Sequence, residues 1–544
     1  MNGVLTGTGS GKAFVSRSVS VSVLILVLLL QFLGIIDHSL WTPDEPREAE
    51  IVREMSISGD YLIPRLAGRP FLEKPPLYYA TAIATYKLFG VYFQEAGRFA
   101  SVLFGVATLL TVYFTTRRIY TDETSDLATL ILATFPLFFL ASHKMLVDVG
   151  LVFFVTAAMC SFILAYKGLF AAGYKVFWLA VACAFLTKGI IGLAIPGAGI
   201  LIFILWQRDF TALREIRAIQ GVLLIAGVMF AWACVLYIKG GYDYLYTFYV
   251  YNQFGRFMPM SSIYEGGHIR PFYFYFKDVP AQTLPWSILL IPGFIRAKSF
   301  HETERFLCSW LLGGLLILSI ASTKREIYFL PMYPAMAMII ACWMSGVLSR
   351  ESLKWERFFL WGILGLILLV SIALPLGYVE GAGGDWRIAF GVSAVLACAF
   401  LFLWKWYRRK LPFLAVMAWS ITLILWIPAL FPLIDQSKGY KQLFTEFGEI
   451  VSHREVTGFK LTETVEALGP FYGDFTVKNI EDREKFIDAL KGRKEGYVIV
   501  LPSRMDEGLY KELSSRAELV HEGGGAMKRE IELWMKHSLP SKDG

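Results

Sequence analysis

The sequence predicts a polytopic α-helical membrane protein with about 13 transmembrane helices and a small C-terminal α/β domain. Of the 544 residues, 56% are hydrophobic and 18% are charged, with a mean hydropathy of +0.52. Soluble domains average about 25% charged residues. The charge is also concentrated, because residues 434–544 carry 37 charged side chains against 60 in the 433 residues before them. We therefore divide the chain into an apolar body and a polar tail domain.

Apolar runs long enough to cross a bilayer, about 20 residues each, recur along the body. The predicted spans lie near residues 20–37, 97–116, 124–141, 147–166, 174–188, 190–206, 219–238, 279–296, 306–321, 327–348, 357–379, 386–404 and 411–433. The pair within 174–206 depends on a break at Thr187-Lys188-Gly189. Without that break the count is twelve, and the tail domain changes sides.

Basic residues predict the orientation of these spans. Every second connector is rich in Lys and Arg, from Arg117-Arg118 to the cluster at 405–410, as expected of cytoplasmic connectors. The same bias explains the net charge of +7 without a nucleic-acid partner. Residues 1–19 are then a cytoplasmic tail, residues 20–433 the membrane domain and residues 434–544 a domain outside the cytoplasm.

The polar tail alternates strand-like and helical patterns. Residues 497–501 are typical of a buried strand and residues 481–490 of an amphipathic helix, which predicts the small α/β fold. None of its residues indicates catalysis. A Gly-rich stretch at 7–12 resembles a phosphate loop but lacks the first glycine and the hydroxyl residue after the lysine. We therefore interpret this stretch as part of a disordered cytoplasmic tail.

Two long external loops, 38–96 and 239–278, interrupt the tight succession of spans. Loops longer than about 15 residues are usually functional. Both loops combine basic and aromatic residues. Within the first, residues 77–90 are apolar but too short to span, which predicts an interfacial or re-entrant helix.

The first loop places Asp44, Glu45, Pro46 and Arg47 just beyond the first span. Pro46 suits the first turn of a helix, and either acid could cap it. The alternative is a carboxylate at the membrane surface, with Arg47 one turn along the chain. Such a carboxylate could bind a metal, take a proton from an acceptor hydroxyl or orient a sugar.

Further along this loop, prolines place Glu73 and Lys74 at the entrance to the short helix that carries Tyr78 and Tyr79. An external lysine beside an aromatic shelf suits a lipid phosphate. The alternative is an anchor whose charged end reaches the interface while its stem packs in apolar surroundings.

Polar residues also lie beside later spans. Asp148 opens an apolar stretch, where a carboxylate is costly and indicates function, although a helix N-cap is the alternative. His268 and Arg270 lie among aromatic rings that fit a sugar or a polyprenyl phosphate, or form an ordinary interfacial belt. A single histidine such as His268 is more often structural than a metal ligand.

Lys324 and Arg325 lie on the side that is otherwise poor in basic residues. This exception calls for an anionic partner such as a diphosphate or lipid phosphate, or for pairing with Glu326. Tyr328 follows one turn later. Acids, bases and rings thus share one membrane face, which predicts chemistry on a lipid-linked phosphate outside the cytoplasm.

In their order and topology these motifs resemble the bacterial 4-amino-4-deoxy-L-arabinose transferases and their relatives, the dolichyl-phosphate-mannose-protein mannosyltransferases. The motifs are Asp44-Glu45-Pro46, Glu73-Lys74-Pro75-Pro76-Leu77, Thr187-Lys188-Gly189, His268 to Tyr273 and Lys324 to Pro331. The resemblance covers residues 20–433. It implies a GT-C glycosyltransferase with thirteen spans and a periplasmic C-terminal domain, in the inner membrane.

The resemblance also implies a polyprenyl-phosphate sugar donor and no nucleotide cofactor. It further implies transfer with inversion and an acceptor that is a lipid or a protein. Asp44 matches the family's essential first-loop acid, while Arg47 and Lys74 would hold the lipid phosphate. Tyr328, Lys324 and Arg325 would support the phosphate side, joined by Arg270. Glu73 and His268 match positions that hold a divalent metal in the arabinose transferases, but two ligands are too few to establish a site.

Two other classes of function stay open from the sequence. A transporter or flippase for a lipid-linked sugar would also need a basic outer face, but repeats and charges within spans, typical of transporters, are scarce. A non-catalytic assembly protein would act through the tail. The acceptor is open between lipid A, another glycolipid and a protein. An alcohol acceptor needs Asp44 as a base, whereas a phosphate acceptor would leave Asp44 to stabilise positive charge on the sugar ring.

Overall fold

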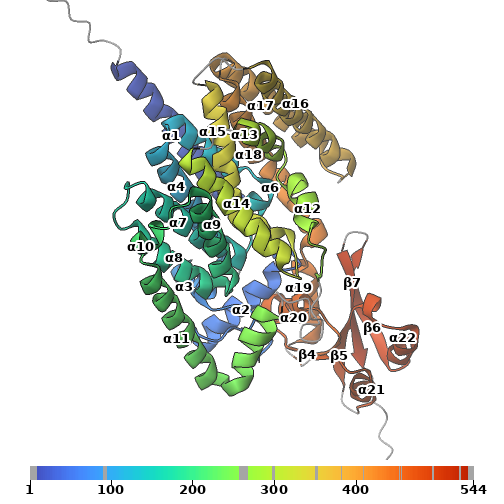
Figure 1. The fold of residues 1–544 in the computed structure, drawn as a ribbon. Coiled ribbons are helices and arrows are strands. Elements are labelled where there is room, and N and C mark those ends of the chain that lie inside the picture. The colour runs from blue at the N-terminus through green and yellow to red at the C-terminus, as the bar shows by residue number, and fades with distance from the viewer. Residues whose placement is uncertain are drawn as a thin grey trace, which may run out of the picture.

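The computed structural model describes residues 9–89, 95–255, 268–296, 301–348, 353–381, 383–408, 410–452, 454, 456–492, 495–525 and 528–536. Parts of the predicted tail 1–19 and of the loops 38–96 and 239–278 lie outside the described residues. The chain is a multi-span membrane protein: a long helical body carries a small sheet domain at the end opposite the start of α1 (Figure 1).

The long helices of the body follow the predicted apolar runs. They are α1 Gly9–Phe32, α4 Arg98–Ile119, α5 Asp122–Ala133, α6 Pro136–Ser142, α7 Val147–Tyr166, α8 Gly173–Lys188, α9 Ile191–Gln207, α11 Ala218–Leu245, α14 Glu302–Ile320, α15 Tyr333–Leu348, α16 Lys354–Leu376, α17 Trp386–Tyr407 and α18 Leu411–Lys438. Helix α7 packs against α4 and α8 and is almost wholly buried. Helices α16 and α17 leave large apolar side chains exposed, which suits contact with lipid.

Among the described residues, eight helices are long and apolar enough to cross a membrane, or nine if a bent pair is one span. Shorter apolar helices occupy Val21–Phe32, Ile191–Gln207 and Trp286–Ile295. The predicted count of thirteen stays a prediction. The split within 174–206 is confirmed, because α8 and α9 are separate helices.

Two predicted spans are not continuous helices. The run 124–141 forms α5 and α6, which meet at 69°, because Pro136 removes a backbone donor and pushes Phe135 out of the helical region. The run 279–296 is divided into the end of α12 (Phe274–Gln282), the 3-10 helix η2 (Trp286–Leu289) and α13 (Leu290–Arg296), with Pro285 at the break.

The outer segments contain their own elements. They are α2 Glu45–Ser58, β1 Arg65–Leu66, β2 Arg69–Pro70, α3 Leu77–Phe89, the π-helix η1 Tyr246–Phe254 and the 3-10 helix η4 Glu326–Met332. Helix α3 confirms the short helix expected at 77–90. The predicted loop 239–278 begins as helix rather than loop, because η1 continues α11 beyond a kink at Gly240 and Gly241. Two short turns, α10 Ala212–Glu215 and η5 Gly377–Gly381, join other helices.

The tail is a small α/β domain, as predicted. Its elements are α19 Lys441–Val451, β3 Val456–Phe459, α20 Glu463–Leu468, η6 Gly469–Gly473, β4 Val477–Ile480, α21 Arg483–Lys491, β5 Gly496–Val500, η7 Pro502–Arg504, α22 Glu507–Ser514, β6 Ala517–Gly525 and β7 Lys528–Lys536. The strand order is β4-β3-β5-β7-β6. Strand β3 pairs in parallel with β4 and β5, whereas β7 is antiparallel to β5 and β6. Helix α20 packs against α2, and α19 packs against η6, which also contacts α2 (Figure 1).

Candidate active site at the outer face

Helix α2 begins at Glu45, directly after Asp44. Pro46 starts its first turn, Glu45 and Glu48 favour its N-terminus, and Gly59 ends it in the left-handed region at φ 70°. Asp44 occupies the N-cap position, yet its side chain makes no capping hydrogen bond. Its carboxylate is therefore directed at partners outside the helix, which favours the functional interpretation over the capping one.

Asp44 is held by two arginines. Arg325 donates to both carboxylate oxygens, with Nη1 at 2.8 Å from Oδ1, and Nη2 of Arg47 lies 3.3 Å from Oδ1. Burial disfavours the charged carboxylate, but the hydrogen bonds and charge of Arg325, with help from Arg47, lower the pKa of Asp44 well below its usual range. Asp44 is thus an ionised, well-held carboxylate.

Glu48 is the centre of the adjoining network, although it is not among the residues predicted for the site. Its carboxylate accepts from Lys74 Nζ, from Tyr79 Oη at 2.6 Å and from Arg47 Nη2 at 3.1 Å. Burial opposes its ionisation, but Lys74 and Arg47 lower the pKa of Glu48. A signal existed, because Glu48 lies four residues after Asp44 and so on the same face of α2.

A small cavity of about 70 Å³ opens beside this network. It is lined by Glu73, Lys74, Leu151, Lys188, Ile191, Asn252, Gln253, Leu318, Ala321, Thr323 and Tyr328. Lys188 pairs with Asp148, and its ammonium lies 4.3 Å from the centre of the Tyr328 ring. Lys188 was quoted for the resemblance but not predicted as a site residue, although a lysine between two spans on the side poor in basic residues was a signal.

The break between α8 and α9 shapes one wall of this cavity. Gly189 has φ 76°, and a Cβ there would lie 2.2 Å from the amide oxygen of Gln253. That oxygen accepts from the backbone N–H of Ile190 at 2.9 Å. Gly189 therefore lets the start of the second long loop close onto the break, which puts η1 against the cavity.

Three predicted site residues lie at the rim. Lys324 donates its ammonium to the carbonyls of Ala321 and, at 3.1 Å, Arg270, so it supports the backbone there. The side chains of His268 and Arg270 are exposed, and the carbonyl of His268 accepts from the backbone N–H of Lys324 at 2.9 Å. Partial burial and then the charge of Arg325 lower the pKa of His268.

The described residues do not form a metal site. No group of three or more His, Cys, Asp or Glu side chains able to hold a metal gathers in the described part of the chain. Glu73 and His268 therefore lack the further protein ligands that a bound divalent ion usually has. The metal stays a prediction, and we derive no step through one.

A second arginine-carboxylate pair, Glu45 with Arg98, fixes the chain that leads to Asp44. Nε of Arg98 lies 2.6 Å from Oε1 of Glu45, and both side chains are fully buried. The same carboxylate accepts from the backbone N–H of Trp41 at 2.7 Å and of Met145 at 3.0 Å. One carboxylate thus ties together the first loop, α4 and the segment before α7.

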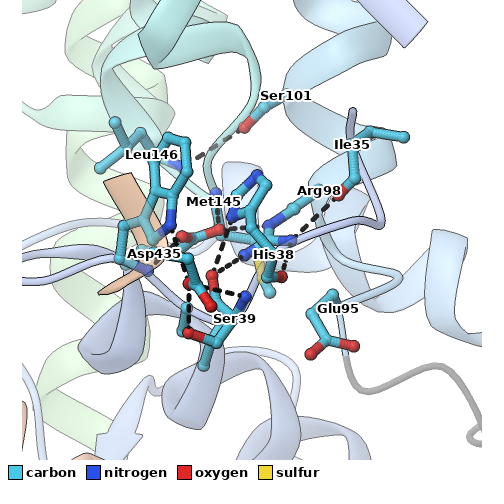
Figure 2. Close-up of polar contacts among 12 residues, drawn as sticks. Ile35, His38, Ser39, Glu95, Arg98, Ser101, Met145, Leu146 and Asp435 are labelled. Carbon is cyan, nitrogen blue, oxygen red and sulfur yellow. Dashed lines mark hydrogen bonds and ion pairs between the residues drawn. The ribbon is translucent and has the colours of Figure 1, made fainter. Parts of the chain in front are cut away.

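The remaining donors of Arg98 hold the backbone of the first loop. Nη1 donates to the carbonyls of Ile35 at 3.0 Å and His38 at 2.9 Å, and Nη2 to that of Ser39 at 2.7 Å; Figure 2 shows Arg98 directed at this turn. From α18, Asp435 accepts from the backbone N–H of Ser39 at 3.0 Å. The turn before Asp44 is therefore fixed from two helices.

The profile of the Dolichyl-phosphate-mannose-protein mannosyltransferase family matches residues 18–253. The undecaprenyl phosphate-alpha-4-amino-4-deoxy-L-arabinose arabinosyl transferase of Edwardsiella ictaluri is 30% identical, over 68% of this chain and 70% of the relative. The chain therefore belongs to the GT-C glycosyltransferase family that includes this arabinosyl transferase. The transferase of the same name from Aeromonas hydrophila is 31% identical, over 62% of each chain, so the match spans less than two thirds of that relative's length.

Solved structures support the GT-C fold. The apo structure of ArnT from Cupriavidus metallidurans superposes with a TM-score of 0.76 at 18% identity, over 97% of this chain and 98% of that one. The structure of the same protein bound to undecaprenyl phosphate gives a TM-score of 0.74 at 19% identity, over 98% and 99% of the two chains. Body and tail domain are both included in these superpositions.

Proposed function

We propose that this GT-C protein is an inner-membrane glycosyltransferase that moves a sugar from a polyprenyl-phosphate donor to an envelope acceptor, with inversion. The site and the tail domain face the periplasm. One observation carries the proposal: Lys74 and Lys188 line the cavity, and Lys74 is linked through Glu48 and Arg47 to the carboxylate of Asp44. This arrangement suits a phosphate leaving group beside a sugar that develops positive charge.

The cations account for the leaving group. In the reaction the bond from the anomeric carbon to the donor phosphate breaks, and its electron pair stays on the phosphate oxygen. The acceptor oxygen forms its bond on the opposite face of the ring, which inverts the anomeric carbon. Lys74 and Lys188 would stabilise the charge that the phosphate gains, and preorganised charge of this kind is usually the largest contribution to catalysis.

The state of Asp44 favours an acceptor that is already an anion. Since Arg325 lowers the pKa of Asp44, this carboxylate is a poor proton acceptor while the pair persists. A phosphate group on lipid A or another glycolipid needs no base, and Asp44 would then stabilise the positive charge on the sugar ring. A hydroxyl of a glycolipid or protein would require Arg325 to leave Asp44 first.

The relatives favour a pentose as the sugar. The family description names mannosyl transfer, but several of the curated relatives, among them those from Aeromonas hydrophila and Edwardsiella ictaluri, are named arabinosyl transferases. We therefore propose a pentosyl rather than a hexosyl donor.

The catalytic proposal is tested with a labelled polyprenyl-phosphate sugar, lipid A as acceptor and purified protein in detergent micelles, where release of lipid phosphate reports transfer and a flippase has no second compartment. Asp44→Asn and Lys74→Ala should lower the rate of release by about 100-fold or more, while the protein stays inserted. Lys87→Ala is the matched control, because Lys87 lies at the exposed end of α3 against Tyr61. Normal release by both site variants would disprove the proposed site.

The acceptor is tested by mass spectrometry of the lipid A fraction from cells with and without the gene. Loss of a mass of pentosamine size supports a phosphate acceptor and a charge-stabilising Asp44. Unchanged lipid A would move the acceptor to another glycolipid or a protein and make Asp44 the base to test.

A further inference from the structure

The tail domain contacts the residues on both sides of Asp44. Oγ1 of Thr464 donates to the carbonyl of Pro43 at 2.7 Å, and Nη1 of Arg47 donates to Glu463 at 2.7 Å. Glu463 and Thr464 are consecutive residues at the start of α20, and Pro43 and Arg47 flank Asp44. The tail domain therefore packs directly against the segment that carries Asp44.

We infer that Glu463 and Thr464 of the tail domain are positioning residues of the transfer site, which hold Arg47 and the backbone before Asp44 in place for the reaction. The inference rests on the proposed function, which it deepens: the body carries the reacting groups, and the tail completes their geometry.

The contacts of Arg47 show why its ion pair with Glu463 matters for the orientation of its guanidinium. Its Nη2 is shared between Asp44 at 3.3 Å and Glu48 at 3.1 Å, both on the side of the cavity, whereas Nη1 is taken by Glu463. Two carboxylates thus draw the guanidinium one way, and one carboxylate from the tail holds its other end. Without Glu463 the guanidinium can turn towards Asp44, which changes the electrostatic field at that carboxylate and its direction.

Helix α20 is itself held firmly enough to serve as an anchor. Its N-cap Thr462 accepts from the backbone N–H of Val465. The buried carboxylate of Glu466 pairs with Arg69 of strand β2 in the first loop and accepts from Asn479 of the tail. The start of α20 is therefore fixed on the first loop at a second point.

A third contact joins the tail to the same segment. The hydroxyl of Tyr472, in η6, accepts from the backbone N–H of Leu40 at 2.8 Å. Residues 40–47 are thus held by the tail at Leu40, Pro43 and Arg47. An enzyme can lose two orders of magnitude in rate when a reacting group moves by about 1 Å. We therefore expect that loss of one of these three contacts, which would let the segment shift, lowers turnover.

The test uses the full-length protein in micelles, with the labelled polyprenyl-phosphate sugar as donor. Glu463→Gln should lower kcat about tenfold and change the KM for the donor by less than twofold, and Thr464→Val should act in the same direction. Glu484→Gln is the matched control, because Glu484 is an exposed acid in the first turn of another tail helix, α21. Control and wild type should have equal kcat.

A double-mutant cycle separates positioning from general loosening of the tail. If Glu463 acts through Arg47, Glu463→Gln should have less than a twofold effect in the Arg47→Lys background. Equal loss of kcat in both backgrounds, or a kcat for Glu463→Gln equal to that of the control, would overturn the inference.

The inference can fail separately from the proposed function. A wild-type protein that transfers no sugar would overturn the proposed function. The same cycle would then be run on binding of undecaprenyl phosphate to the micellar protein. Non-additive weakening by the two substitutions supports the positioning role, and additive or absent effects overturn it.

Discussion

Asp44 and Glu45 are neighbours in the chain, and each pairs with an arginine, yet the two pairs serve different ends. The side chains of Glu45 and Arg98 are both 0% exposed, and every remaining donor of the guanidinium that we describe reaches a backbone carbonyl. Asp44 and Arg325 are 15% and 21% exposed, and Asp44 is linked through Arg47 and Glu48 to Lys74, which lines the cavity. The first pair is enclosed and saturated, whereas the second is accessible to a ligand.

The difference indicates that two features distinguish a structural ion pair from one that can meet a ligand. They are the burial of the two side chains and the other hydrogen-bond partners of the arginine, rather than the residue types. A fully buried ion pair is costly to form and costlier to break, because the survivor keeps its charge without a partner. In a partly exposed pair, one side chain can exchange its partner for a ligand with a smaller loss of free energy.

The largest effect should come from breaking the enclosed pair. Arg98→Ala leaves the buried carboxylate of Glu45 unpaired and frees three carbonyls, so we expect the free energy of unfolding to fall by about 3–5 kcal/mol. Thermal unfolding in detergent measures this. Arg117→Ala, which removes an exposed pair with Asp122, should cost about 1 kcal/mol or less. Equal losses in the two variants would contradict the distinction.

The accessible pair should show the opposite pattern. Asp44→Asn should lower kcat by about 10²–10³, as expected when a charge-stabilising group is removed, while the unfolding temperature falls less than in Arg98→Ala, because the pair of Asp44 and Arg325 is partly exposed. Donor turnover and thermal unfolding on the same preparation check both. A variant that unfolds like Arg98→Ala would show that the pair of Asp44 is a structural one as well.

A third carboxylate, Asp148, extends the comparison to the other side of the cavity. Asp148→Asn removes the charge that holds Lys188 over the ring of Tyr328. We expect kcat to fall about 30-fold, less than for Asp44→Asn, because the ammonium remains but loses its direction. Steady-state kinetics with the labelled donor measure the change. A larger loss than in Asp44→Asn would reverse the proposed ranking of the two acids.

Glu50, on the same helix as Asp44, should give the smallest effect and the opposite dependence on pH. Burial outweighs its contact with Arg53 and raises the pKa of Glu50 from 4.5 to about 7. Because the folded state holds this proton more tightly, stability should fall as pH rises from 4.5 through 7, by about 2 kcal/mol between pH 5.5 and 7.5. The stabilising effect of Asp44 is instead present above pH 3.8 and lost in stronger acid.

Thermal unfolding between pH 5.5 and 7.5 measures the effect of Glu50. Glu50→Gln should flatten the profile in this range, with wild type as the reference. An unchanged slope in the variant would assign the pH dependence to another group.

Much of the fold and part of the site could be predicted, because long apolar runs mark the spans and a charged side chain beside such a run is easily recognised. Asp44, Lys74, Asp148 and Arg325 stood out because charged side chains beside apolar spans are costly and so indicate function. The structure brings Asp44, Lys74 and Arg325 into one ion-pair network, and it pairs Asp148 with Lys188, which lines the same cavity as Lys74. The bends at Pro136 and Pro285 were visible as prolines, but hydropathy averaged over a window does not register a local loss of backbone hydrogen bonds.

The rest of the network depends on distances in space that local patterns do not carry. Glu463 lies 416 residues from Arg47 in the chain, and Arg98 lies 53 residues from Glu45. Each of these charges looks ordinary in its own segment, a polar domain in one case and the start of a span in the other. Only the packing of body and tail decides which acid meets which arginine.

The contacts that hold the turn before Asp44 can form only after distant parts of the chain have been synthesised. Ser39 and Leu40, near the start of the chain, rely on Asp435 and Tyr472, which leave the ribosome near its end. The first helices can insert into the bilayer long before those partners exist, as domains emerge in order from the N-terminus. A nascent chain that has not yet reached Tyr472 would lie in the membrane with these contacts unmade, so the segment before Asp44 takes its final arrangement only after this part of the tail domain has been synthesised.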